Sequence, residues 1–231
     1  MNGRTKFKNS QVQKKAFLML LFLSVVEFLY AQRTYDLTFL ASPQVSWMTS
    51  DSKFIGHGKV FTGFGYGVEG DIFLHSDNYM IVTGLTICTA GGSLVYNTPV
   101  PFGPKQLPGG TTVNYYLQNL EVPLALKMRT RNFNRMRYFA QFGLTNWFNL
   151  KTKATSNEEG SSTRKEVIRK EIRFYNIGLN VGAGLEYELG RGNALTGGLI
   201  YSSGFVDATR NARINDATTL NVLRLRLGFV F

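Results

Sequence analysis

The segment of residues 174–189, FYNIGLNVGAGLEYEL, alternates between apolar and polar or small side chains. Successive side chains of an extended strand point to opposite faces, so a period of two indicates a β-strand with one apolar face. That face carries Tyr175, Ile177, Leu179, Val181, Ala183, Leu185, Tyr187 and Leu189. The other face carries asparagine, glycine and glutamate. The chain must therefore bury the apolar face in a protein core or expose it to lipid.

The same alternation occurs in eight segments, which predicts eight strands. They cover about residues 35–48, 60–74, 79–90, 114–128, 137–151, 174–189, 194–205 and 219–231. The connections alternate in length, with HSDN, RTRNFNRM and GRGN as the shorter ones and about residues 49–59, 91–113, 152–173 and 206–218 as the longer ones. Short turns on one side and long loops on the other are typical of outer-membrane barrels.

The polar faces indicate which side of the sheet is inside. They combine glycines, such as Gly63, Gly65 and Gly67, with long charged side chains. Glycine weakens a solvent-facing strand, but it makes room inside a narrow barrel, whose interior is filled by side chains. We therefore expect an all-β fold, an eight-stranded antiparallel up-and-down transmembrane β-barrel with a packed polar lumen. The rival is a soluble lipocalin-like barrel, whose apolar face would point inward.

Charged residues gather toward the short-turn end of the predicted lumen, and we expect them to form a mixed-sign structural layer. The layer comprises Asp36, Glu69, Asp71, Glu121, Lys127, Arg137, Glu186, Glu188, Arg224 and Arg226. Buried charges persist when they are paired, so such a layer can plug the lumen. An ion path or gate is the functional alternative.

The N-terminus predicts a secretory signal peptide over residues 1–31, followed by a barrel domain over residues 32–231. Lys14 and Lys15 precede the apolar run AFLMLLFLSVV (16–26), and Ala31 offers a cleavage site. The run is too short to span a bilayer as a helix. An uncleaved N-terminal anchor is the alternative. With a signal peptide, we expect export through the inner membrane to the bacterial outer membrane.

The remaining motifs favour neither a cofactor nor a metal. GYGVEG (65–70) matches a dinucleotide fingerprint but lies inside a predicted strand, with no helix after it. His57 and His75 fall at opposite ends of the predicted barrel, which disfavours a metal site shared by both. His57 with Asp51 and either Ser50 or Ser52 is a weak candidate for a lipid-modifying enzyme. The single cysteine, Cys88, is interpreted as a small packed residue.

The net charge of +11 raises nucleic acid as a partner, but no recognition motif accompanies it and the chain is predicted to be secreted. Bases in the predicted outer loop 153–173 and in the turn region 127–137 favour anionic lipid headgroups or envelope proteins. The expected partners are outer-membrane lipid, the outer-membrane assembly machinery and other envelope proteins through the outer loops, with no nucleic acid.

Five stretches have a recognisable pattern: GYGVEGDIFLHSDNYMIVTGL (65–85), NLEVPLALKMR (119–129), YFAQFGLTNWFNLK (138–151), NIGLNVGAGLEYEL (176–189) and the ending LRLRLGFVF. These stretches resemble the PorT-like outer-membrane β-barrel family of Bacteroidota. The resemblance implies an eight-stranded barrel and, for its founding members, an accessory role in protein export. Phe229 and Phe231 resemble the assembly signal on the last strand of such barrels.

We expect a non-enzymatic barrel with a structural or interaction role, including an accessory role in protein export or envelope integrity. The alternatives are a narrow porin-like channel for uptake and a lipid-modifying outer-membrane enzyme.

Overall fold

Eight long strands form a closed sheet in the computed structural model, which describes residues 35–52, 54–74, 76–102, 105–157, 165–166, 174–205 and 218–231. The long strands are β1 (Tyr35–Ser50), β3 (Phe61–Phe73), β4 (Tyr79–Tyr96), β7 (Thr111–Arg129), β8 (Met136–Asn157), β10 (Tyr175–Gly190), β11 (Asn193–Gly204) and β12 (Thr218–Val230). The expected signal peptide or anchor and His75 lie outside the described residues.

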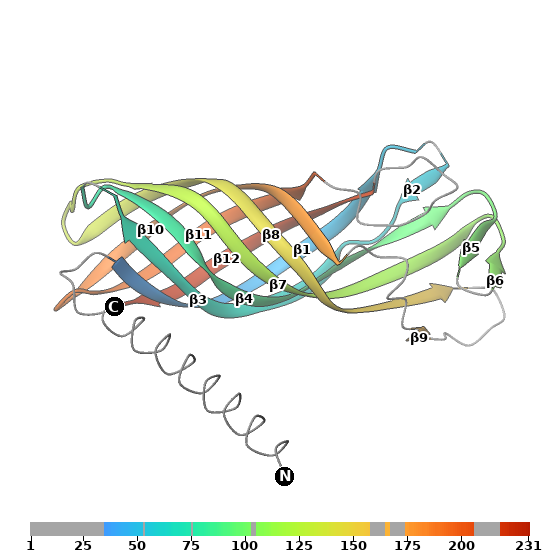
Figure 1. The fold of residues 1–231 in the computed structure, drawn as a ribbon, viewed down its shortest axis with the longest axis horizontal. Helices are drawn as coiled ribbons and strands as arrows, with labels where there is room; N and C mark the ends of the chain where they lie inside the picture. Colours follow the sequence, from blue (N-terminus) through green and yellow to red (C-terminus); the bar gives the residue numbers. More distant parts are fainter. Residues whose placement is uncertain are drawn as a thin grey trace, which may run out of the picture. The chain divides into compact units, whose positions relative to one another are not determined.

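The sheet is an up-and-down barrel in which each long strand pairs antiparallel with its neighbours along the chain (Figure 1). β12 pairs with β1, and β8 pairs with β10, so the ring is closed. A closed ring leaves no unpaired backbone edge, which is the condition for a sheet exposed to lipid. The predicted eight-stranded up-and-down barrel is confirmed.

Among the described residues, no helix is long and apolar enough to cross a membrane.

The apolar faces of the strands point outward, as the alternation predicted. Leu179 is partly exposed, while its neighbours Gly178 and Asn180 are buried. Leu85 and Leu124 are more than half exposed, yet Lys127 and Asp71 are fully buried. This inside-out distribution is that of a barrel whose wall faces lipid, because a water-soluble barrel would place the leucines inside.

Three short connections lie at one end of the barrel, here called the turn end, and the longer connections lie at the other, the loop end (Figure 1). At the turn end, Asn134 and Arg135 both have positive φ, and Phe133 and Met136 bond to each other on either side of them. A two-residue turn with two positive φ values matches the twist of a hairpin. RTRNFNRM is therefore a tight hairpin end rather than an eight-residue loop.

β4, β7 and β8 extend farther toward the loop end than the alternation predicted (Figure 1). β4 continues to Tyr96, β7 begins at Thr111 and β8 continues to Asn157, inside segments that we expected to be loops. Short strands accompany this extension: β2 (Ile55–His57) pairs with β4, β9 (Lys165–Glu166) with β8, and β5 (Val100–Phe102) with β6 (Lys105–Leu107).

A bulge interrupts the β7–β8 ladder at the height where the extension begins. Asn119 pairs with Asn149, but Gln118 pairs with Lys151, so Leu150 is an extra residue in β8. An extra residue shifts the alternation of its strand by one position. Buried positions are odd-numbered in β8 up to Trp147 and even-numbered at Thr152 and Ala154.

Candidate functional site

The turn-end half of the lumen holds a network of buried ion pairs, and we treat this packed lumen as the candidate site. Lys127 Nζ lies 2.6 Å from Asp71 Oδ2 and 2.5 Å from Glu186 Oε1. Arg129 Nη1 lies 3.0 Å from Glu186 Oε2 and 3.2 Å from Asp36 Oδ2. These five side chains join β1, β3, β7 and β10 across the lumen.

The network offsets a repulsion that the sheet register creates. Asp36 and Asp71 are direct cross-strand partners on β1 and β3. Like charges directly opposite each other on a sheet are destabilising. Each carboxylate has its own cation from β7, Arg129 for Asp36 and Lys127 for Asp71. The two bases therefore balance a like-charge pair that the fold places side by side.

A second group of contacts crosses the lumen from β12. Arg226 Nη2 lies 2.7 Å from Glu69 Oε2, and Arg226 Nη1 donates to Gln141 Oε1 at 3.2 Å. Gln141 in turn donates to Asn180 Oδ1 at 2.8 Å. These contacts connect β3, β8, β10 and β12, so most of the barrel wall is joined through its interior.

A third group lies next to it around Glu121. Arg224 forms a buried ion pair with this carboxylate. Trp147 Nε1 donates to Glu121 Oε2 at 3.0 Å, and Cys88 Sγ lies 3.7 Å from the same oxygen. Cys88 is buried, in keeping with its interpretation as a packed residue.

The ring of Phe139 lies between the first two groups. Lys127 Nζ lies 4.6 Å from its centroid and Arg226 Cζ lies 5.6 Å from it, as in cation–π contacts. A Cβ atom on Gly184 would lie 2.5 Å from Phe139 Cζ, so the absence of a side chain there lets the ring fit. This is the role that we expected for the lumen glycines.

The loop-end half of the lumen is apolar, whereas we expected polar packing throughout. A cluster of buried residues fills it: Met48, Ile55, Ala90, Leu94, Tyr96, Val113, Tyr115, Leu117, Trp147, Ala154, Leu220 and Val222. Within it the hydroxyls of Tyr96 and Tyr115 bond to each other at 2.9 Å. β4 and β7 contribute many of these apolar side chains, which face the lumen at this end. The lumen therefore has an ionic layer and an apolar layer.

The ten residues of the predicted charge layer do not all lie in one group. Eight belong to the buried contacts described above, namely Asp36, Glu69, Asp71, Glu121, Lys127, Glu186, Arg224 and Arg226. Arg137 and Glu188 form a separate pair at 3.4 Å, with side chains about 30% exposed. Sequence reasoning assigned Arg129 to the turn region and missed its place in the lumen. Arg129 has an odd residue number, as do the lumen-facing Glu121 and Lys127 of the same strand. The alternation of β7 could therefore have placed Arg129 in the lumen.

The residues of the weak enzyme candidate have structural contacts. The Ser50 hydroxyl accepts the backbone N–H of Ser52, and the Ser52 hydroxyl accepts that of Phe54. His57 lies in β2, where its backbone pairs with Leu94. Within the described ranges, no three histidine, cysteine, aspartate or glutamate side chains form a group that could hold a metal ion.

Phe229 and Phe231, the predicted assembly signal, point outward at the turn end. Their rings lie 5.5 Å apart, and Phe231 also contacts Phe39 at 5.0 Å. The backbone of Phe231 exchanges two hydrogen bonds with Leu37, which fastens the end of the chain to β1.

No family model matches this chain, and no curated protein matches its sequence. Among solved structures, the barrel is similar to neisserial surface protein A, with 11% identity, 85% of this chain and 96% of that chain covered, and a TM-score of 0.47. It is also similar to a major outer membrane protein from Thermus thermophilus, with 16% identity, coverages of 85% and 98%, and a TM-score of 0.47. OprG from Pseudomonas aeruginosa matches at 13% identity, with coverages of 85% and 94% and a TM-score of 0.40.

Proposed function

We propose that this chain is an integral outer-membrane barrel that acts through the surface it presents at its loop end, not by conducting solute and not as an enzyme. The filled lumen carries the non-conducting part of this proposal. Side chains of Lys127, Asp71 and Glu186 seal the turn-end half, and an apolar cluster around Leu94 and Val113 seals the other. Paired charges in one layer and apolar packing in the other both disfavour a continuous hydrated path for ions, and this supports the non-conducting part of the proposal.

The extension of β4, β7 and β8 supports the interaction part of the proposal. These strands project past β3, β11 and β12, and β2 and β9 pair onto them (Figure 1). A sheet that continues beyond the barrel costs backbone entropy, and it gives a rigid support to the loops it carries. The resemblance to PorT-like proteins further favours an accessory role in protein export or envelope integrity.

Planar-bilayer recording tests the sealed lumen. We expect the folded full-length chain to give no steady ionic steps above the bare bilayer. The double variant Lys127→Ala/Leu94→Ala removes side-chain volume from both the ionic and the apolar layer. It serves as the positive control for detecting conductance. Stable ionic steps from the unmodified protein would overturn the sealed-lumen proposal and favour the narrow channel.

Copurification tests the interaction role. The tagged full-length chain is isolated from native outer membranes in mild detergent, and the proteins that accompany it are identified. We expect a specific envelope partner, lost when residues 158–173 are deleted and retained when the turn-end variant Arg131→Gln is used instead. Both variants must keep the electrophoretic shift between unheated and boiled samples that a folded barrel shows. An unchanged set of accompanying proteins after the deletion would contradict the role of this loop.

A further inference from the structure

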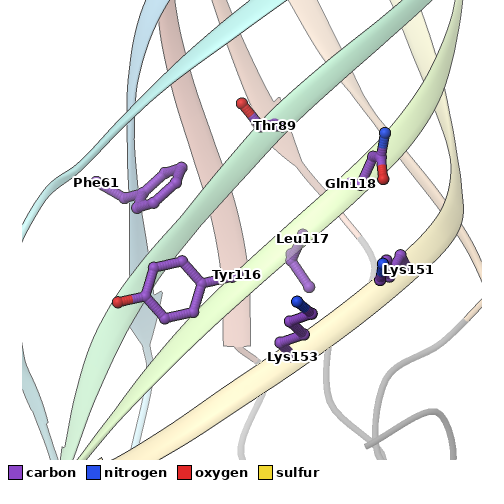
Figure 2. Close-up of a pocket in the computed structure, with 7 residues that line it drawn as sticks. All are labelled: Phe61, Thr89, Tyr116, Leu117, Gln118, Lys151 and Lys153. Atoms are coloured by element: carbon purple, nitrogen blue, oxygen red, sulfur yellow. The ribbon is translucent and has the colours of Figure 1, made fainter. Parts of the chain in front are cut away.

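A groove of about 410 Å³ crosses the outer wall of the barrel near its loop end. Its lining residues come from β3, β4, β7 and β8 and are Phe61, Thr89, Tyr116, Leu117, Gln118, Lys151 and Lys153 (Figure 2). We propose that this groove binds the phosphorylated headgroup of an outer-leaflet lipid, an inference that rests on the proposed outer-membrane location.

The sheet register brings the two lysines together with a tyrosine on one face. Lys153 is the cross-strand partner of Tyr116, and Lys151 is the partner of Gln118 (Figure 2). The β7–β8 bulge decides where Lys151 points. Without the extra residue Leu150, strict alternation after Trp147 and Asn149 would direct Lys151 into the lumen. With it, Leu150 and Lys151 are both exposed on the outer wall.

The other side of the groove is aromatic. Phe61 and Tyr116 meet edge to face, with centroids 5.4 Å apart. Gly91 of β4 pairs with Tyr116, and a Cβ atom there would be in ordinary contact with the Phe61 ring, 3.4 Å from its Cγ. The two rings therefore pack beside β4 at this position. The groove thus combines an aromatic wall with a cationic wall.

Among the described residues, no carboxylate balances the charge of the groove. No ion pair among the described residues includes Lys151 or Lys153. No carboxylate lines the groove either. Two neighbouring ammonium groups repel each other, so an anion between them is favoured. Three oxygens and a negative charge make a phosphate suitable for two lysines at once.

The height of the groove favours a lipid phosphate over a soluble one. Phe61 pairs with Ser46, the neighbour of Trp47, and Trp47 stacks on Tyr201 with centroids 6.2 Å apart. Tryptophan and tyrosine on the outer wall of a barrel mark the boundary between hydrocarbon and headgroups. The lysines therefore lie at headgroup depth. Phe61 and Tyr116 lie beside them, where the same lipid molecule would contact both rings.

Native mass spectrometry of the folded full-length chain in detergent tests this site, with monophosphorylated lipid A and its dephosphorylated form as probes. We expect the protein to prefer the phosphorylated form, and the double variant Lys151→Gln/Lys153→Gln to lose about tenfold in affinity for it, since each base near an anionic surface contributes favourably. Arg131→Gln/Arg135→Gln makes the same charge change at the turn end and should bind as the unmodified protein does. Tyr116→Ala should weaken both probes alike.

Equal binding of the two probes by the unmodified protein would overturn the inference. Undiminished binding by the lysine double variant would overturn it too. Insertion of the same preparations into phosphatidylcholine vesicles is measured in parallel by electrophoretic shift. If the chain inserts but shows no preference for the phosphorylated probe, only the proposed lipid site is contradicted. If the chain fails to insert, both the proposed membrane location and the lipid site are contradicted.

Discussion

At the scale of single residues, Lys127 is the side chain on which the lumen network depends most. It is fully buried, bonds two carboxylates from different strands and lies over the ring of Phe139. Its loss would leave Asp71 without its cation and Glu186 with Arg129 alone. A buried carboxylate without a partner is far more costly than an exposed one.

We therefore expect Lys127→Met, which keeps the volume of the side chain, to lower the free energy of unfolding by about 3–5 kcal/mol. Urea unfolding in lipid vesicles, followed by tryptophan fluorescence, measures it. Arg137→Gln is the matched control because its pair with Glu188 is about 30% exposed, and the expected change is about 0–1 kcal/mol. Equal changes for the two variants would show that the buried network contributes little to stability.

Trp147 is a second residue whose role is specific. Trp147→Phe keeps an aromatic ring in the apolar cluster but removes the N–H that Glu121 accepts. We expect a loss of about 1–3 kcal/mol in the free energy of unfolding, because a hydrogen bond to a buried charge is removed. Trp47→Phe, on the outer wall, should cost less. Fluorescence of the remaining tryptophan reports unfolding in each variant, and a neutral Trp147→Phe would contradict the assigned contact.

At the scale of elements, the sequence predicted the existence and order of the eight strands well, because lipid on one side and packed side chains on the other impose a strict period of two. It predicted strand ends less well. β4 carries apolar residues on both faces, and β8 changes its buried face at Leu150, so alternation alone could not show that these strands continue. The groove could not be predicted either, because without the bulge the alternation does not place Lys151 on the same face as Tyr116.

The candidate site was predicted in part for the same reason. Glu121, Lys127 and Arg224 follow the alternation of their strands, and their buried positions could be counted from it. Which carboxylate meets which base depends on the register between distant strands, such as β3 with β7 through the lumen, and a single-strand pattern contains no such information. Arg129 was missed because it lies at the last position of β7, where strand and turn could not be separated.

The hairpin between β7 and β8 allows a test at this scale. Arg135 has φ of 68°, a left-handed conformation that side chains with a Cβ atom adopt at a cost. We expect Arg135→Gly to raise the free energy of unfolding by about 0.5–1 kcal/mol and Arg135→Val to lower it by at least that much. The urea midpoint measures both. Arg131→Gly, in the same connection, should give no gain, and a stable Arg135→Val variant would contradict the assigned turn.

At the scale of the whole molecule, the barrel has the reverse of a soluble protein's arrangement, in which apolar side chains are buried and charged ones are exposed. Leucines cover the outside while lysine, arginine and glutamate are enclosed. The wall is stable only where the surrounding medium is as apolar as the leucines, and the interior is stable only because its charges are paired. Because the outer wall contacts lipid, the free-energy cost of placing a charged side chain on it depends on the depth of that side chain in the membrane.

Two leucines of β8 measure that depth dependence. Leu144 pairs with Leu124 and Leu179 in the middle of the apolar wall, while Leu150 lies beyond Phe148, which contacts Phe174 and Tyr175 near the loop end. Both side chains point outward and are exposed to a similar degree. In lipid vesicles we expect Leu144→Arg to lower the free energy of unfolding by about 2–4 kcal/mol and Leu150→Arg by about 0–1 kcal/mol.

The difference between the two arginine variants separates a lipid-facing wall from a water-facing one. In water, an arginine at either exposed position would be solvated and both changes would be small and similar. In hydrocarbon, the central arginine must draw water or headgroups toward it, whereas the outer one reaches the headgroups directly. Equal and small effects in vesicles would therefore mean that the leucine wall does not contact acyl chains, and the phosphate groove at its loop end would then lack the lipid that it is proposed to bind.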